Sequence, residues 1–212
     1  MKPRISPYVI AFSIFAVLPF AQAQAEQPTD DSWGRHDFRV TSTTISNGGT
    51  LPLSMILNTS ASGYQCTYFT GGGNQSPQLS WSNAPRGTRS FTVIAYDVTG
   101  TFTHWGMYNI SHKTTALPEN AGVAGSTLGT QVGNDFGDAS YDGPCPPPQY
   151  NPPSHNYVFT VYALDIELPT IPAFGDFTPP GPESLYHALI DAQMDGHILD
   201  RASISTSFPG SK

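Results

Sequence analysis

Three short runs of aromatic and β-branched residues place the strongest constraint on how this chain can fold. They occupy residues 90–96 (SFTVIAY), 104–110 (HWGMYNI) and 156–165 (NYVFTVYALD). Each run has the length and the residue types of a buried β-strand. The segments between them are rich in Gly and Pro, of which the chain has 20 each, whereas charged residues make up only 12%. This combination predicts a mostly β fold with long loops.

Two further strand patterns and a single helix complete the predicted elements. Residues 37–45 alternate in the manner of a strand, and residues 202–208 fit a last strand. Pro182 to Met194 has Pro at its start, apolar residues at helical spacing, and Gly196 as a stop signal. Residues 113–135 show little periodicity and are expected to form a long connection.

The N-terminal residues have the parts of a secretory signal peptide. Positively charged residues precede an apolar run, and small-x-small cleavage sites end at Ala23 and Ala25. The run is short for a membrane span, so an uncleaved anchor is the alternative that we set second. No Cys follows the run, and lipoprotein anchoring is therefore not indicated. We expect a signal peptide at 1–25, a flexible mature N-terminus at 26–36, and one domain at 37–212, in the periplasm or secreted.

The charge of the chain argues against nucleic acid as a partner. The net charge is −7, and removal of residues 1–25, which carry Lys2 and Arg4, leaves seven basic and sixteen acidic residues, a net charge of −9. Such a protein repels the phosphate backbone of DNA and RNA. A pocket has its own local field, so a small anionic ligand remains compatible with this charge.

The chain has two cysteines, Cys66 and Cys145. In an oxidising compartment an even pair is typical of one disulfide. Two separate buried thiols are the alternative, and the expected export favours the disulfide. Their spacing fits neither a CxxC redox motif nor a zinc site.

Polar side chains with binding chemistry fall at the ends of the three strong strands. Asp97 ends the first, and His104 begins the second seven residues later. A hairpin would bring both to the same end of a sheet. His155 begins the third strand after the Pro-rich part of residues 134–165, and Tyr157 lies on the same face by alternation. These side chains are expected to converge if the three strands are neighbours.

The residue types favour an anion site at this point. A nearby carboxylate favours the imidazolium form of a His, which can donate to a phosphate or carboxylate together with a Tyr hydroxyl. Backbone amides near Gly143 would add donors. Two alternatives use the same residues: a two-His-one-carboxylate metal triad, and a hydrolase. The hydrolase lacks a G-x-S-x-G motif, and neither Ser76 nor Ser80 has a nucleophile signature. A purely structural role for each His is the third.

Four segments, taken in order, resemble the phosphatidylethanolamine-binding protein family, in its bacterial branch of Raf-kinase-inhibitor-like proteins (the YbhB/YbcL type). The resemblance covers roughly residues 37 to 208. Its motifs are SPQLSW with APRGTRS at 76–90, Asp97 with HW and YNI at 104–110, NDFG, Tyr141 and GPCPP at 134–147, and HNYVF with YALD at 155–165.

The resemblance implies a β-sandwich with a large central antiparallel sheet, a smaller sheet and a C-terminal helix. It also implies a small anion pocket without catalytic residues, cofactor or metal. The ligand-binding residues carried over from the family are Asp97, His104, Gly143, Pro144, His155 and Tyr157. Exported relatives tend to carry a cysteine pair at the places of Cys66 and Cys145, which supports the disulfide.

The sequence departs from the family pattern beside the predicted pocket. Val98-Thr99-Gly100 follows Asp97, so a second Asp and both Pro residues of the family motif are missing. Asn156 replaces an Arg, on the face opposite to the pocket by alternation. We expect altered ligand preference or a less ordered rim rather than loss of the fold.

The sequence thus favours an exported, non-enzymatic binding protein for a small anionic or phospholipid-like ligand. The alternative is a protein-interaction or inhibitor module with a vestigial pocket and an unidentified protein partner. A metal-dependent or hydrolytic enzyme comes third. Nucleic acid is not expected as a partner, and neither is a stable membrane span after signal removal.

Overall fold

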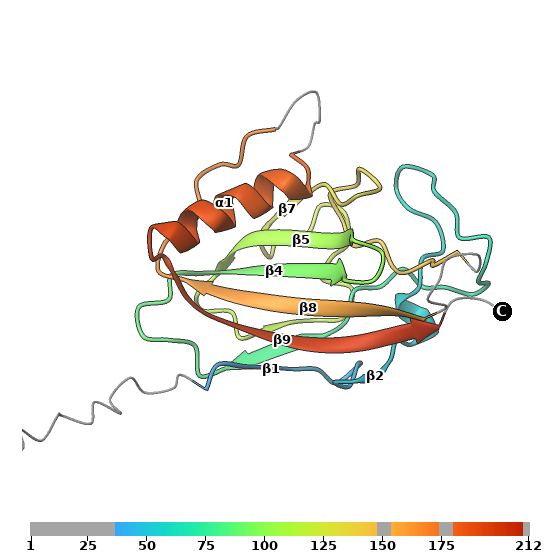
Figure 1. Ribbon diagram of the computed structural model, residues 1–212, viewed down its shortest axis with the longest axis horizontal. Helices are drawn as coiled ribbons and strands as arrows, with labels where there is room; N and C mark the ends of the chain where they lie inside the picture. Colours follow the sequence, from blue (N-terminus) through green and yellow to red (C-terminus); the bar gives the residue numbers. More distant parts are fainter. Residues whose placement is uncertain (1–36, 148–153, 174–179, 210–212) are drawn as a thin grey trace, which may run out of the picture. The chain divides into compact units, whose positions relative to one another are not determined.

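In a computed structural model, the described residues 37–147, 154–173 and 180–209 form two β-sheets, one α-helix and one short 3-10 turn (Figure 1). All of them belong to one compact unit, Arg35–Lys212. The predicted signal peptide and flexible segment, residues 1–36, lie outside the described residues. The same is true of residues 148–153 in the Pro-rich loop.

The larger sheet has six strands in the order β2-β9-β8-β4-β5-β7. All neighbours are antiparallel except β2 and β9, which are parallel. The strands are β2 (Gly49–Thr50), β9 (Ile198–Pro209), β8 (Ser154–Leu164), β4 (Ser90–Asp97), β5 (Phe102–Ser111) and β7 (Thr130–Val132).

The smaller sheet lies against one face of the larger one and closes the main core. Its order is β1-β3-β6, with β1 (Arg39–Thr41), β3 (Leu79–Ser82) and β6 (Ala116–Leu117). The core between the sheets holds large buried side chains from both layers, among them Trp81, Phe91, Trp105 and Phe159. The predicted sandwich of a large and a small sheet is confirmed.

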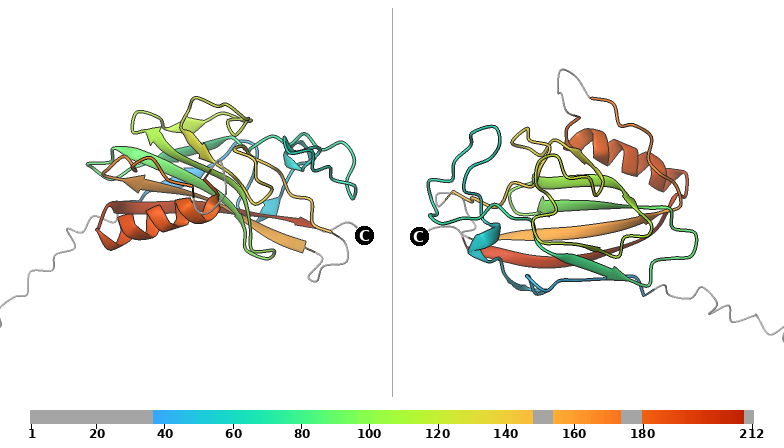
Figure 2. Two further views of the ribbon diagram at one scale, coloured as in Figure 1. Left: turned by 90° about the horizontal axis from the view of Figure 1, so that it is seen from above. Right: turned by 180° about the vertical axis from the view of Figure 1, so that it is seen from behind.

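The helix α1 (Pro182–Met194) covers the other face of the larger sheet (Figure 2). Leu185 and Leu189 of α1 pack with Ile94 of β4 and Leu164 of β8 in a second buried cluster. Because β4 is covered on both faces, nearly all its residues are buried, which explains why its sequence is mostly apolar. The bounds of α1 agree with the prediction. None of the described helical segments combines the length and the apolar character that crossing a membrane would take.

Some predicted boundaries were wrong, for local reasons. The strand expected at 37–45 is limited to β1, because the Ser42 hydroxyl accepts hydrogen bonds from the amides of Thr44 and Ile45 and turns the chain. The connection expected at 113–135 contains the short strands β6 and β7. The strand β3 and the 3-10 turn Leu53–Met55 were not predicted.

The pairing of β4 with β5 contains a bulge that orients two side chains. Tyr96 pairs with Thr103 and Ala95 with Trp105, so His104 is an extra residue between the two pairs. Thr103 bonds to Tyr186 of α1, whereas Trp105 lies in the core between the sheets. The bulge therefore lets His104 and Trp105 share the sandwich side, which simple alternation would not allow.

We predict that packing beneath α1 contributes measurably to stability. Leu185 is 1% exposed, whereas Ile190 of the same helix is 56% exposed. Leu185→Ala should lower the free energy of unfolding by about 2–5 kcal/mol because it opens a cavity. The matched variant Ile190→Ala should change it by less than about 0.5 kcal/mol. Urea unfolding followed by tryptophan fluorescence measures both, and equal losses would contradict the assignment of the buried face.

Candidate anion-binding cavity

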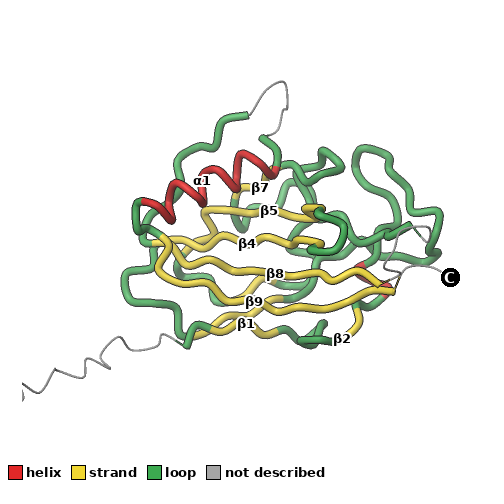
Figure 3. Tube along the Cα trace, viewed as in Figure 1, coloured by secondary structure: helices red, strands yellow, loops and turns green. Residues whose placement is uncertain are grey.

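A cavity of about 630 Å³ lies at the end of the larger sheet where β4 ends and β5 and β8 begin. Figure 3 shows the loops that gather at this end of the sheet. Asp97, His104, His155 and Tyr157 line the cavity, so four of the six predicted ligand-binding residues come together there. The other lining residues are Leu57, Tyr64, Gln65, Thr67, Tyr68, Thr99, Gly100, Phe102, Phe136, Cys145, Pro146 and Pro147.

Asp97 and His155 form a buried hydrogen-bonded pair in this cavity. Asp97 pairs with Tyr157 in the ladder between β4 and β8, which places His155 within reach. His155 Nδ1 lies 2.6 Å from Asp97 Oδ2, and both residues are less than 10% exposed. A carboxylate only accepts, so Nδ1 carries the hydrogen and Nε2 is the ring nitrogen left for the cavity.

The turn after Asp97 is tied to both neighbouring strands, although it departs from the family motif. The amides of Thr99 and Gly100 both donate to Asp97 Oδ1 at 2.8 Å. Thr99 Oγ1 accepts from the amide of Asn156 on β8. A Cβ atom at Gly100 would lie 2.7 Å from Asp97 Oδ2 and 3.3 Å from His155 Nδ1, so glycine is needed for this close approach. Asn156 is exposed, as alternation predicts.

His104 faces the same cavity from β5 and is fixed by a backbone carbonyl. Its Nδ1 lies 2.7 Å from the carbonyl oxygen of Asp142, which also only accepts, so Nδ1 again carries the hydrogen. Burial lowers the pKa of His104 to about 4, and the Asp142 carbonyl and Asp97 oppose this effect without cancelling it. His104 is therefore neutral at neutral pH, with a lone pair on Nε2.

Tyr157 supplies a hydroxyl between the two histidines. Its ring centroid lies 5.4 Å from that of His104 and 6.4 Å from that of His155. Burial raises the pKa of Tyr157, so its hydroxyl keeps its proton and can donate. Among the described residues, no side chain or backbone group is hydrogen-bonded to this hydroxyl.

A buried polar network holds Asp142, the residue whose carbonyl fixes His104. Asn74 and Asn134 donate to the two carboxyl oxygens of Asp142 at 2.9 and 2.8 Å. Burial raises the pKa of Asp142, against the effect of these two hydrogen bonds. Asn74 Oδ1 also accepts from the amide of Gly143. The network holds the Asp142 carbonyl in the position that fixes His104.

Gly143 and Pro144 are placed differently from the prediction. Neither lines the cavity, and the rim is formed by the next residues, Cys145, Pro146 and Pro147. The Gly143 amide is already bonded to Asn74, so it is not available to a ligand in this conformation. A Cβ atom at Gly143 would lie 2.0 Å from the Met55 carbonyl, and close backbone packing therefore explains the glycine.

A disulfide joins the two loops that form the outer walls of the cavity. Cys66 and Cys145 are bonded, with a Cα–Cα distance of 5.7 Å and a sequence separation of 79. Gln65 and Thr67 line one side, and Pro146 the other. The predicted cysteine pair thus holds the rim to a distant segment.

Aromatic side chains near the mouth were missed by the sequence analysis. The Phe136 ring lies 4.7 Å from that of Phe102 and 5.0 Å from that of Tyr64. Tyr64 and Tyr68 are 63% and 41% exposed. Their segment has no periodic pattern, so the sequence offers no signal that they face the cavity.

The geometry was also compared with the metal and hydrolase alternatives. In residues 37–147, 154–173 and 180–209, no group of three or more His, Cys, Asp or Glu side chains is arranged to hold a metal ion. Asp97 already accepts from His155 and two amides. No serine is among the described lining residues, and the Thr99 hydroxyl is bonded to Asn156.

We predict that His104 destabilises the fold in acid. Its pKa is about 4 in the folded chain, against an ordinary value of 6.5. The unfolded chain therefore binds more protons between these values, and stability present above pH 6.5 is lost as the pH falls to about 4. This loss amounts to roughly 3 kcal/mol.

His104→Asn isolates this effect, because the Asn amide can replace the Nδ1 donor but does not titrate. The loss of unfolding free energy between pH 7 and pH 4 should be smaller in His104→Asn by most of that amount. His112 is exposed, and His112→Asn serves as the control that keeps the wild-type profile. Urea unfolding at several pH values measures the three proteins, and parallel profiles for all of them would refute the assignment.

The sequence is similar to that of one protein family and of several bacterial relatives. The sequence matches the profile of the phosphatidylethanolamine-binding protein family over residues 41–209. The UPF0098 protein YbcL of Escherichia coli K12 is 40% identical over 175 residues, which cover 79% of this chain and 81% of YbcL. The UPF0098 protein YbhB of the same organism is 36% identical over 144 residues, 65% of this chain and 83% of YbhB.

Solved structures agree with these sequence matches. The crystal structure of E. coli YbcL, described as a new member of the mammalian PEBP family, superposes with a TM-score of 0.62 at 33% identity, over 81% of this chain and 98% of that one. A putative PEBP homolog from Chlamydia trachomatis gives a TM-score of 0.58 at 29% identity, over 80% and 95%. The resemblance predicted from the motifs is confirmed.

Proposed function

Because the chain belongs to the phosphatidylethanolamine-binding protein family, we propose that it is an exported binding protein whose cavity holds a small phosphate-like anion. The observation that carries this proposal is the fixed orientation of His104 and His155. Each imidazole is anchored through Nδ1, at 2.7 and 2.6 Å, so that Nε2 remains for a ligand. Tyr157 lines the same cavity, and its hydroxyl adds a donor. The ligand chemistry is that of a free phosphate or of a phospholipid head group.

The size and lining of the cavity suit a small organic anion. Its volume of about 630 Å³ falls within the usual range of small-molecule sites, roughly 300–1,000 Å³. Polar and aromatic side chains both line it, and the rings of Phe102 and Phe136 lie beside His104. A ligand with a charged group and an apolar part would match both kinds of lining.

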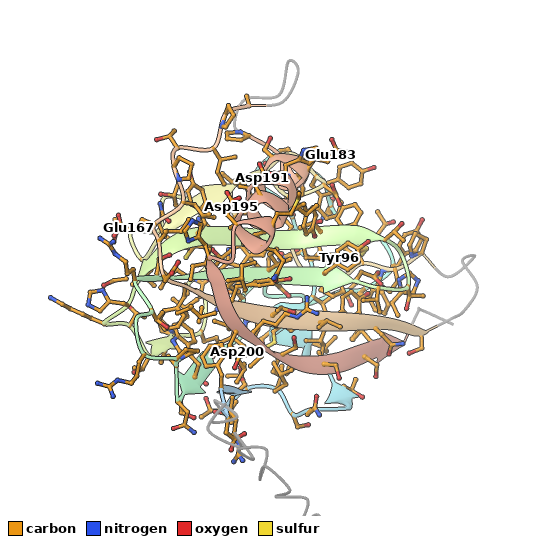
Figure 4. The ribbon with its side chains drawn as sticks, turned by 60° about the vertical axis from the view of Figure 1, so that its left-hand side comes forward. Tyr96, Glu167, Glu183, Asp191, Asp195 and Asp200 are labelled. Atoms are coloured by element: carbon orange, nitrogen blue, oxygen red, sulfur yellow. A yellow bond between two sulfur atoms is a disulfide. The ribbon has the colours of Figure 1, made fainter. Side chains whose placement is uncertain are left out.

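The acidic character of the chain does not oppose an anion at this place. Four acidic residues lie around the end of the sheet where β8 ends and β9 begins: Asp191 of α1, Asp195 directly after it, Glu167 and Asp200 (Figure 4). The cavity lies at the other end of β8, whose 11 residues span roughly 35 Å. Salt at physiological strength screens exposed charges beyond about 8 Å. The field of these acids therefore contributes little at the cavity.

The hydrolytic alternative has less support than binding. The Asp97–His155 pair resembles the orienting part of a catalytic triad, but no serine is among the described lining residues, and in the described structure His155 forms no hydrogen bond to the Thr67 or Thr99 hydroxyl. We therefore propose binding without catalysis.

Titration by NMR tests the anion site. With inorganic phosphate at millimolar concentration, the imidazole signals of His104 and His155 should shift saturably, while those of exposed His112 should not. His155→Ala should weaken binding about 10- to 100-fold, because a hydrogen bond to a charged group is worth roughly 1.5–3 kcal/mol. Parallel titration with O-phosphoethanolamine separates head-group preference from plain phosphate binding. If neither histidine signal responds to either ligand, the anion site is refuted.

Export rests on the sequence of residues 1–25 and on the disulfide between Cys66 and Cys145. In cells that express the full chain, we expect the protein in the periplasmic or secreted fraction. Its intact mass should correspond to a chain that starts at Gln24 or Glu26, with the disulfide formed. An uncut chain confined to the cytoplasm, with both thiols free, would count against export.

A further inference from the structure

The hydrogen-bonding groups of the cavity are unequally divided between its two walls. Both imidazoles use Nδ1–H for a fixed protein acceptor, so a neutral ring offers only a lone pair at Nε2. Among the described lining residues there is no Lys or Arg, and Asp97 brings a carboxylate. Within the strands, an anion finds side-chain donors at Tyr157 and at His155 when its Nε2 carries a hydrogen. The other side-chain donors of the lining belong to residues outside the strands: Tyr64, Gln65, Thr67, Tyr68 and Thr99.

The wall formed by β8 and β4 is suited to donate hydrogen bonds to an anion. His155 Nδ1 lies 2.6 Å from the carboxylate of Asp97, which holds the ring so that Nε2 is left for the cavity. When Nε2 carries a hydrogen, it donates to an anion. Tyr157 adds its hydroxyl beside His155, on the same face of β8. These two groups can hold two oxygens of an oxyanion.

The wall formed by β5 is suited to accept a hydrogen bond from a ligand. His104 is 5% exposed and is packed among the rings of Phe102, Tyr157 and Phe136. This apolar surrounding disfavours a charged ring, and burial lowers the pKa of His104 accordingly. A bare anionic oxygen placed against its Nε2 lone pair would be repelled, whereas an O–H group would be bound.

Other titratable groups around His104 do not reverse this assignment. Asp97 on β4 favours its charged form, while His155 on β8 disfavours it. The Tyr157 ring packs edge-on against His104, and Asp142 contacts it through the backbone carbonyl. The groups that would add a proton to His104 are thus weaker than the burial that removes it.

We infer that the cavity selects oxyanions that carry their own proton, that is, phosphate monoesters as monoanions, with His104 Nε2 accepting the ligand O–H. This inference rests on the proposed anion site and names its ligand class. The bound ligand keeps its P–O–H bond: its oxygens accept from His155 and Tyr157, and its hydroxyl donates to His104. At a pH where the free monoester is a dianion, binding therefore takes up one proton from solvent. Sulfate esters and phosphodiesters have no such hydrogen.

Two ligands that differ mainly in one O–H group test whether the cavity recognises the hydrogen of the ligand. At pH 5, methyl phosphate and methyl sulfate are both monoanions of nearly equal shape, and they differ mainly in one O–H group. Calorimetry should show methyl phosphate binding at least tenfold tighter than methyl sulfate. At pH 8, methyl phosphate is a dianion, and this ratio should fall at least tenfold. Because His155 meets an anionic oxygen of either ligand in the same way, the ratio of the two affinities reports on the ligand proton.

Dimethyl phosphate provides a third arm, since it represents the diester of a phospholipid without its tails. It should bind like methyl sulfate. Binding as tight as that of methyl phosphate would show that the O–H group is not read, and it would point to a head-group diester instead.

His104→Gln tests the assigned acceptor. The Gln amide can present either a donor or an acceptor near the place of Nε2, so the ratio of the two affinities at pH 5 should approach one. If this variant loses all binding, proton uptake by the wild-type protein still tests whether the ligand binds with its proton. Calorimetry at pH 8 in buffers of different ionisation enthalpy should show one more proton taken up with methyl phosphate than with methyl sulfate.

The outcomes separate the inference from the proposed function. Equal affinities of the wild-type protein for methyl phosphate and methyl sulfate, with equal proton uptake, would overturn the selection by His104 and leave the anion site intact. An absence of binding by every ligand at every pH would overturn both. An unchanged ratio in a His104→Gln variant that still binds would also overturn the role of His104.

Discussion

The buried hydrogen bond between Asp97 and His155 is the interaction on which the cavity depends. It joins the end of β4 to the start of β8, and it fixes which nitrogen of His155 a ligand can meet. The same carboxylate holds the following turn through the amides of Thr99 and Gly100. One side chain therefore orders both a binding group and a wall. A buried carboxylate would be costly without such partners, and here the described structure provides three of them.

His104, on the opposite wall of the cavity, is held in a different way from His155. His104 reaches the cavity through a bulge in β5 and is fixed by a carbonyl, not by a charge. Its support comes from the buried network of Asp142, Asn74 and Asn134. The two histidines thus have unlike surroundings within one cavity. His155 lies against a carboxylate, whereas His104 lies among aromatic rings. This difference underlies the proposed selection of a protonated ligand.

Four of the six predicted site residues lie together in one cavity because their prediction rested on strand ends, and their role in binding stays a prediction. Neighbouring antiparallel strands must bring Asp97, His104 and His155 to one edge, and alternation places Tyr157 with His155. Gly143 and Pro144 were carried over from the resemblance, and the structure sets them behind the rim. The aromatic residues Tyr64, Phe102 and Phe136 were missed because loop and strand-end residues carry no pattern that tells where they point.

The sequence by itself determined the main strands, the helix α1 and the cysteine pair, because hydrophobic periodicity and helix-end signals are local properties of the chain. The family followed from short motifs in a fixed order, and the comparisons agree with it. Only the tertiary structure decided which nitrogen of each histidine faces the cavity. That choice depends on acceptors 58 residues away from His155 and 38 residues away from His104. Such contacts arise when strands pair and loops pack, and no local pattern in the sequence encodes them.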